Sequence, residues 1–167
     1  MPSTIKAYFC AIMLKTKILL VLFLALGAFS SCKKEEYEPE KQLAVDDALI
    51  KDFIAKNSIV AIKHSSGVYY QIISPGTGSL SYTGATQVTV NYEGKLLSGS
   101  VFDKSSSAVT FSLGGLIPGW QIGIPLIQKG GKIRLLIPST LAYMNQSRVG
   151  IPENSVLDFT IELINAQ

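Results

Sequence analysis

The residue types that most often do covalent or metal chemistry are scarce in this chain. It has one histidine, His64, beside a Ser-Ser-Gly turn, and two cysteines, Cys10 and Cys32, both near its beginning. It contains no HExxH pair, no GxSxG elbow and no glycine-rich phosphate loop. A single histidine cannot hold a zinc ion by itself. The composition therefore disfavours nucleophilic and metal-assisted hydrolysis, and a reaction that needs no nucleophile fits it better.

A different set of residues recurs in order between Val88 and Leu163. Its members are aromatic, aliphatic, glycine and proline residues, the only tryptophan, Trp120, among them, together with Asp103 and Lys132. Each short element is weak alone, but nine in one order are hard to produce by chance. They are Val88-x-Val90-x-Tyr92-x-Gly94, Phe102-Asp103, Phe111-x-Leu113-Gly114, Ile117-Pro118-Gly119-Trp120, Gly130-Gly131-Lys132, Ile137-Pro138, Leu141-Ala142-Tyr143, Ile151-Pro152 and Leu157-x-Phe159-x-Ile161-x-Leu163.

This ordered set resembles the FKBP-type peptidyl-prolyl cis-trans isomerases, over almost the whole second half of the chain. The resemblance implies an α+β fold in which a curved antiparallel β-sheet wraps around one short α-helix, preceded here by a short N-terminal helix. It also implies isomerisation of X–Pro segments, without a cofactor and without a metal.

The resemblance assigns nine residues to one pocket. It gives Trp120 as the floor under the proline ring, and Asp103 as the carboxylate beside the rotating carbonyl. The Tyr143 hydroxyl and the backbone N–H of Ile117 are the expected donors to the carbonyls that flank the proline. We assign catalytic roles to Asp103, Trp120 and Tyr143, and substrate binding to Tyr92, Phe102, Leu116, Ile117, Ile151 and Phe159. Four further apolar residues are assigned to the core: Phe111, Leu113, Leu135 and Leu163.

Such a pocket suits prolyl isomerisation for a physical reason. Rotation about the peptide C–N bond faces a barrier of about 18–20 kcal/mol, because the bond has partial double-bond character. Conjugation is lost in the twisted transition state, and water stabilises the planar, more polar amide. A dry pocket with a few fixed dipoles therefore favours the twisted geometry without a strong acid or base.

Several positions depart from the family pattern. The segment 104–109 is shorter than in the drug-binding eukaryotic members and lacks their loop arginine, and Val109 stands where they often carry phenylalanine. Met144 follows Tyr143 where many relatives have glycine. These changes leave the predicted floor of the pocket, Trp120, intact but alter the rim of the pocket. Macrolide binding is therefore the family property that they put in doubt.

The first 32 residues predict export. Lys15 and Lys17 precede an apolar run, Ile18–Phe29, which is followed by Ser30-Ser31-Cys32. This pattern is typical of a secretory signal over residues 1–31, with the true start possibly at Met13. The run is shorter than the roughly 20 residues of a membrane-spanning helix. Cys32 resembles the lipidated cysteine of a bacterial lipoprotein, of a kind similar to those of Bacteroidetes.

The signal also explains the net charge. Three of the 15 basic residues and none of the 12 acidic ones lie in residues 1–31, so the remainder carries equal numbers of each. The scattered lysines and arginines give no basic surface for nucleic acid. We expect a lipid-anchored protein of the cell envelope, at the outer membrane and facing the periplasm or the surface.

Three segments are expected after the signal. Residues 32–45 contain KKEEYEPEK and are predicted to be a solvated tether, or alternatively a surface-export signal. Residues 46–58 are predicted to form a short amphipathic helix, with Asp46 as its N-cap, Asp47 in its first turn and Asn57 as a left-handed stop. Its apolar face contains Leu49, Ile50, Phe53 and Ile54, which pack either on the same domain or on another chain.

Residues 59–167 are predicted to be the isomerase domain. Alternation in Val88–Tyr92, Ile133–Ile137 and Leu157–Leu163 indicates strands with one buried and one wet face. Trp120–Gln128 is expected to form a short or kinked helix, because Pro125 lacks a backbone N–H.

Two functional classes remain open beside each other. The leading one is an isomerase that assists the folding of exported proteins. The alternative is a module that grips proline-containing or hydrophobic segments without turnover, as a holdase or as a subunit of an envelope or gliding complex. A lipid-tethered spacer comes last, because a spacer does not need Asp103, Trp120 and Tyr143 together.

Overall fold

The computed structural model describes residues 37–167 of the chain. The predicted signal over residues 1–31 and the predicted lipidation site at Cys32 lie outside the described residues. The described elements are α2 (Pro39–Lys56), β1 (Ile62–Lys63), β2 (Tyr69–Ser74), β3 (Gln87–Leu96), β4 (Val101–Lys104), β5 (Val109–Ser112), η2 (Leu113–Gly115), α3 (Pro118–Gly123), η3 (Ile124–Leu126), β6 (Lys132–Ile137), η4 (Ser139–Leu141) and β7 (Leu157–Ala166).

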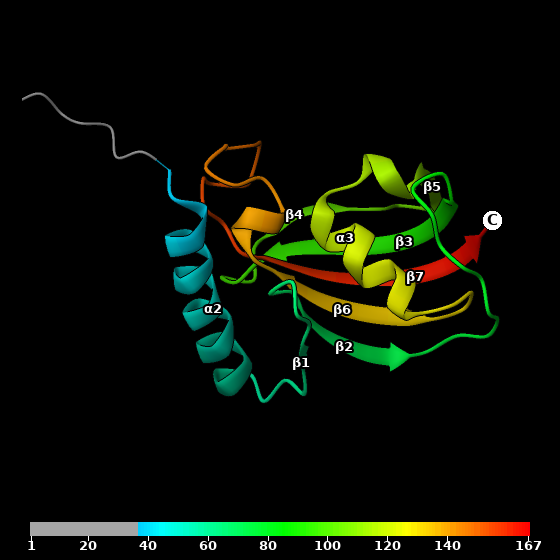
Figure 1. Cartoon of the computed structure of the whole chain (residues 1–167), viewed down its shortest axis with the longest axis horizontal. Helices are drawn as coiled ribbons and strands as arrows, with labels where there is room; N and C mark the ends of the chain where they lie inside the picture. The colour runs from blue at the N-terminus through cyan, green and yellow to red at the C-terminus, as the bar shows by residue number, and fades with distance from the viewer. Residues whose placement is uncertain (1–36) are drawn as a thin grey trace, which may run out of the picture. The chain divides into compact units, whose positions relative to one another are not determined.

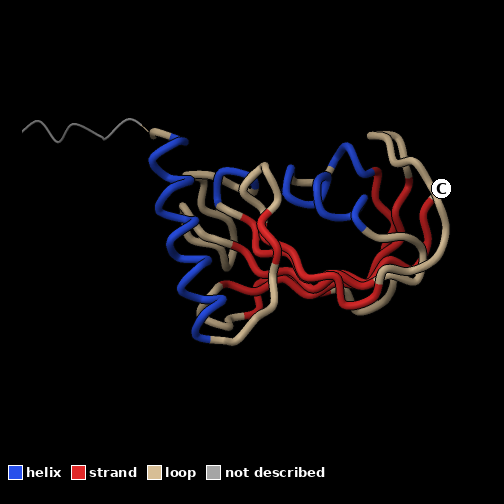
Figure 2. The backbone as a smooth tube through the Cα atoms, turned by 60° about the horizontal axis from the view of Figure 1, so that its bottom comes forward, coloured by secondary structure: helices blue, strands red, loops and turns tan. Residues whose placement is uncertain are grey.

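Within residues 37–167, seven strands form one sheet in the order β1-β2-β6-β7-β3-β4, and β5 also pairs with β3. Every pairing is antiparallel. The sheet curls strongly and α3 lies inside the curl, as Figures 1 and 2 show. The predicted α+β fold, a curved antiparallel sheet around one short helix, is confirmed.

The inner helix α3 begins two residues earlier than predicted and ends sooner. Pro118 occupies its first turn, where a missing N–H costs nothing. Pro125 cannot donate a backbone hydrogen bond, so the α-helix does not continue past Gly123. The chain instead forms the 3₁₀ turn η3, which contains Pro125. Gly119 and Gly123 let α3 approach β6 closely, since a Cβ at either position would collide with Ile137 or Leu135.

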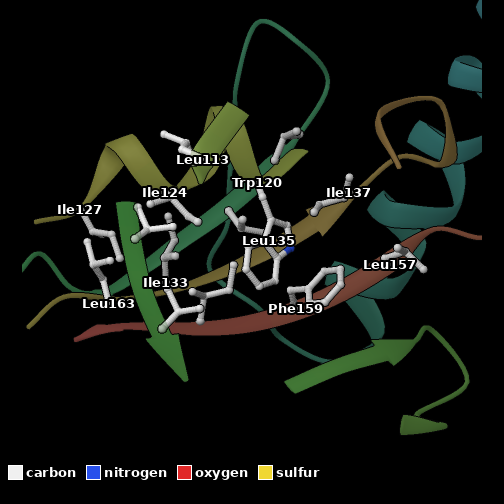
Figure 3. Close-up of a cluster of buried hydrophobic side chains, with 14 of the residues drawn as sticks. Leu113, Trp120, Ile124, Ile127, Ile133, Leu135, Ile137, Leu157, Phe159 and Leu163 are labelled. Carbon is white, nitrogen blue, oxygen red and sulfur yellow. The ribbon is translucent and has the colours of Figure 1, made fainter. Parts of the chain in front are cut away.

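The main core lies between α3 and the concave face of the sheet. Trp120 points from α3 toward Phe159 on β7, and Leu135 from β6 lies beside them (Figure 3). The alternating residues predicted from the sequence fill this space. Its buried members include Val88, Val90, Leu113, Trp120, Ile124, Ile127, Ile133, Leu135, Ile137, Leu157, Phe159, Ile161 and Leu163.

The N-terminal helix α2 begins at Pro39, so the prediction of a tether to residue 45 and a helix over residues 46–58 is wrong at its start. Pro39 opens the helix, and Asp46 is fully buried in its middle instead of capping its end. Asn57 is the C-cap residue but has φ −102°, and the left-handed residue is Ser58, with φ 52°. The first turn of α2 contains charged residues that face solvent, and such a composition does not indicate a packed helix. The sequence therefore did not reveal where the helix begins.

One side of α2 packs on its own domain. Ile50 is completely buried against Tyr69, Leu136 and Val156. Leu136 follows Leu135 on β6 and therefore points to the opposite face of the sheet from α3. The alternation in β6 had predicted that this outer face of the sheet is exposed to solvent. Where α2 covers it, the face is buried instead. Leu49, predicted to be on the packed side, is 48% exposed. No helix within residues 37–167 is both long enough and apolar enough to cross a membrane.

Asp47 connects α2 to the first two strands. Its carboxylate accepts from Lys51 at 2.7 Å, from Lys63 at 2.6 Å and from the Tyr69 hydroxyl at 2.8 Å. The hydrogen bond from Lys51, then that from Lys63, holds the pKa of Asp47 well below its ordinary range. A carboxyl group with a depressed native pKa contributes stability above its unfolded pKa of about 3.9, and that contribution is lost as the pH falls further.

We therefore expect Asp47→Asn to be less stable than the wild type at neutral pH, and the difference to narrow as the pH drops from about 5 toward 2. Urea unfolding of the wild type and of Asp47→Asn at several pH values measures this difference in the free energy of unfolding. A stability difference that stays constant over this range would contradict the assignment.

Candidate active site

A cavity of about 300 Å³ opens above Trp120 on the concave side of the sheet. This volume lies at the lower end of the usual range for ligand pockets. The residues around it come from the four strands β3, β4, β5 and β7, from the helix α3 with the segment before it, and from the loop after η4. They are Tyr92, Phe102, Asp103, Phe111, Gly115, Leu116, Ile117, Trp120, Tyr143 and Phe159.

Gly94 on β3 allows two of the aromatic walls to meet. A Cβ at this position would lie 2.6 Å from both Phe102 and Phe159. The two rings pack edge to face, with their centroids 5.4 Å apart and their planes at 87°. Any side chain at residue 94 would therefore push these rings apart or into the cavity.

Trp120 is held by the neighbouring rings. Its ring centroid lies 5.2 Å from Tyr92 and 5.1 Å from Phe159, in nearly perpendicular orientations. Edge-to-face pairs at this separation are favourable because the positive ring edge meets the negative ring face. Trp120 is only 4% exposed. The floor of the cavity is consequently rigid and apolar.

The polar groups of the cavity lie at its mouth. The Tyr92 hydroxyl donates to Oδ2 of the exposed Asp103 at 2.8 Å. Burial first, and then this hydrogen bond and the charge of Asp103, raise the pKa of Tyr92 to about 12. The Tyr92 hydroxyl therefore stays protonated across the physiological range and keeps Asp103 in place.

Tyr143 reaches the cavity from the loop that follows η4. It is half-buried, and the guanidinium carbon of Arg148 lies 5.7 Å from the centre of its ring. Within residues 37–167, the Ile117 backbone N–H donates to no backbone or side-chain acceptor. The Tyr143 hydroxyl and the Ile117 N–H are thus two donors at the edge of the cavity, in addition to the Tyr92–Asp103 pair at its mouth.

Eight of the nine sequence-predicted site residues line this cavity, and Ile151 does not. Ile151 is 5% exposed and belongs to the main core, while its backbone pairs with Arg148. Its place on the rim was therefore wrong, because the loop folds back and turns this side chain inward. His64 closes its own turn, with Nδ1 2.9 Å from Oγ of Ser66.

Sequence reasoning missed two lining residues, Phe111 and Gly115. Phe111 was assigned to the core because it alternates with core positions, yet its ring lies 6.3 Å from both Tyr92 and Trp120 at the cavity wall. Alternation identifies the concave face but does not separate its closed part from its open part.

Comparison with known proteins decides the family. Residues 80–164 match the family described as FKBP-type peptidyl-prolyl cis-trans isomerase. The chain belongs to this family. It is 40% identical over 134 residues to the FKBP-type peptidyl-prolyl cis-trans isomerase FkpA of Escherichia coli strain K12, which covers 77% of this chain and 49% of that protein. The chain thus spans about half the length of the curated relatives it matches first.

Solved structures of FKBP-type and related isomerases show the same arrangement. The crystal structure of Escherichia coli FkpA aligns with a TM-score of 0.66 and 32% identity, covering 92% of this chain and 82% of that one. A peptidyl-prolyl cis-trans isomerase from Pseudomonas syringae pv. tomato aligns with a TM-score of 0.64 and 29% identity, covering 79% of this chain and 98% of that one.

Met144, which replaces the glycine common in the FKBP pattern, has a strained backbone conformation. Its φ is 55°, in the left-handed region, which disfavours residues with a Cβ. Its N–H donates to the Ser139 carbonyl and its own carbonyl accepts from the Asn154 N–H, each at 2.8 Å, so the loop enforces this conformation. A glycine would relieve the strain.

We expect Met144→Gly to raise the free energy of unfolding by up to about 1 kcal/mol, which is the left-handed penalty less the extra backbone entropy of glycine. Met144→Ala is the matched control, because it removes the exposed side chain but keeps the Cβ. Urea unfolding compares the three proteins. A glycine variant less stable than the alanine variant would show that Met144 is not strained.

Proposed function

We propose that this chain is a peptidyl-prolyl cis-trans isomerase that acts on X–Pro segments of exported polypeptides. The observation that carries the proposal is an aromatic cavity of about 300 Å³ with Asp103 and Tyr143 at its mouth, in a chain of the FKBP family. The name of the Escherichia coli relative states the same activity.

The cavity accounts for catalysis without covalent chemistry. The proline ring stacks on Trp120 and is enclosed by Tyr92, Phe102 and Phe159, so water leaves the amide. Loss of water disfavours the planar amide, which is more polar than the twisted one. Donors at Ile117 and Tyr143 hold the flanking carbonyls, and Asp103 fixes the electrostatic field at the rotating carbonyl. Such preorganised dipoles act most strongly in a water-poor site.

A protease-coupled assay on an X–Pro peptide, with the chain from Lys33 onward, tests the activity. We expect kcat/KM to vary little between about pH 6 and 8, because the assigned groups have no ordinary pKa in that range. A bell-shaped profile centred near neutrality, or loss of activity on His64→Ala, would overturn the mechanism. Inhibition by an added macrolide in the same assay tests drug binding.

The second candidate is a binding module without turnover. It is favoured by exposed apolar side chains in the loop beyond Tyr143, where Met144 is 46% and Val149 is 98% exposed. A holdase needs such a surface, whereas isomerisation of a short peptide does not. Suppression of aggregation that persists in variants without isomerase activity would support this candidate.

For location, we propose the cell envelope, with a lipid anchor at Cys32 in the outer membrane and a Bacteroidetes-like export route. The signal pattern over residues 1–31 and the small residues before Cys32 support it. Cys32→Ser is expected to release the protein from membranes or to leave it unprocessed. Unchanged membrane association and processing would contradict the lipid anchor.

A further inference from the structure

Asp46 is a fully buried carboxylate far from the cavity in sequence. It has no exposed surface and lies in the middle of α2. Its Oδ2 accepts from the Ser139 backbone N–H at 2.7 Å and from the Ser139 hydroxyl at 2.6 Å. Its Oδ1 accepts from Nε2 of Gln42 at 2.7 Å. Both oxygens are therefore satisfied, and two of the three bonds go to one residue of η4.

Ser139 in turn fixes the backbone on both sides of Tyr143. It is also fully buried, and its carbonyl accepts from the Ala142 N–H at 3.0 Å and from the Met144 N–H at 2.8 Å. Residues 142 and 144 flank Tyr143. Figure 1 shows α2 beside the turn η4, from which this loop starts. One continuous set of hydrogen bonds thus runs from Asp46 through Ser139 to Ala142 and Met144, the two residues that flank Tyr143.

Docking of α2 does not explain the buried charge. Ile50 and its apolar neighbours bury one side of the helix, and Asp47 ties it to β1 through Lys63 and to β2 through Tyr69. Burial of a carboxylate is costly, and an apolar residue of similar size often serves stability as well or better. What an apolar residue cannot do is bind the N–H and hydroxyl of Ser139 and so set the orientation of η4.

We propose that Asp46 is a positioning residue for prolyl isomerisation, which holds the turn at Ser139 so that the Tyr143 hydroxyl meets the substrate carbonyl. This inference rests on the proposed function. It makes α2 a working part of the active site, although none of the residues of α2 lines the cavity.

A double-mutant cycle on the chain from Lys33 onward tests this inference. Asp46→Asn, Tyr143→Phe and the double variant are compared by kcat/KM, at a temperature where circular dichroism shows each to be folded. We expect Asp46→Asn to lower kcat/KM about tenfold, mainly through kcat, and to have an effect of less than about twofold in the Tyr143→Phe background. Asp47→Asn is the matched control, with a neighbouring docked carboxylate and no bond to η4, and should leave kcat/KM unchanged.

Ser139→Ala serves as a second variant if Asp46→Asn does not fold, because it removes one of the two bonds and should show a smaller loss with the same dependence on Tyr143. An equal loss of kcat/KM in both Tyr143 backgrounds, or an equal loss in Asp47→Asn, would mean that Asp46 only stabilises the fold. Either result leaves the isomerase function standing and overturns the inference.

If the wild type proves inactive, the proposed function fails and the positioning is read by NMR. The Tyr143 ring resonances, assigned by their loss in Tyr143→Phe, are then expected to shift in Asp46→Asn and Ser139→Ala but not in Asp47→Asn. Unshifted Tyr143 resonances in both variants would overturn the inference independently of activity.

Discussion

Trp120→Ala is expected to lower the free energy of unfolding by about 3–5 kcal/mol and to remove most isomerase activity. The ring is 4% exposed and lies within 5.2 Å, centroid to centroid, of both Tyr92 and Phe159, so truncation leaves a hole in the core as well as in the cavity floor. Urea unfolding and kcat/KM of the folded protein measure the two effects separately.

Leu163→Ala is the control for this variant. Leu163 is fully buried in the same core but does not line the cavity. It should cost about 2–5 kcal/mol of stability, with little change in kcat/KM of the folded protein. If Trp120→Ala kept wild-type kcat/KM in its folded fraction, Trp120 would be a core residue only.

The double variant Asp103→Ala, Tyr143→Phe is expected to lose about a hundredfold or more in kcat/KM, since each lost polar contact raises the barrier by roughly 1–3 kcal/mol. Its stability should change little, because Asp103 is exposed and Tyr143 keeps its ring. Neither single variant should abolish activity, as loss of a nucleophile would.

Tyr92→Phe is the matched control for the double variant, since it removes the 2.8 Å hydrogen bond to Asp103 but leaves the carboxylate and the ring wall. Its loss should be smaller than that of Asp103→Ala. Full activity in the double variant would mean that the reaction takes place elsewhere.

The sequence predicted the strands and the short helix on the concave side of the sheet. It predicted less well the helix α2, which packs on the other side. Alternation located β3, β6 and β7, because their core-facing residues are apolar. The start of α2 was missed, since seven charges between Lys33 and Lys41 are typical of a tether, whereas docking by Ile50 and Asp47 stabilises the helix through tertiary contacts.

Two site residues show the same limit. Ile151 and Phe111 both belong to apolar patterns, and neither pattern says which side chain faces the cavity and which faces the core. That choice is made by the loop after Tyr143 and by the end of β5, where the chain turns. Asp46 was interpreted from its local position as a helix cap, and only the contact with Ser139, 93 residues away, gives it another role.

The most direct test of the account is NMR exchange spectroscopy on an X–Pro peptide with a small fraction of an equivalent of the protein. Catalysis predicts faster exchange between cis and trans resonances, with their populations unchanged, and a return toward the uncatalysed rate with the Asp103→Ala, Tyr143→Phe double variant. Peptide resonances that shift on added protein while the exchange rate stays at its uncatalysed value would show binding without turnover, and would contradict the isomerase account.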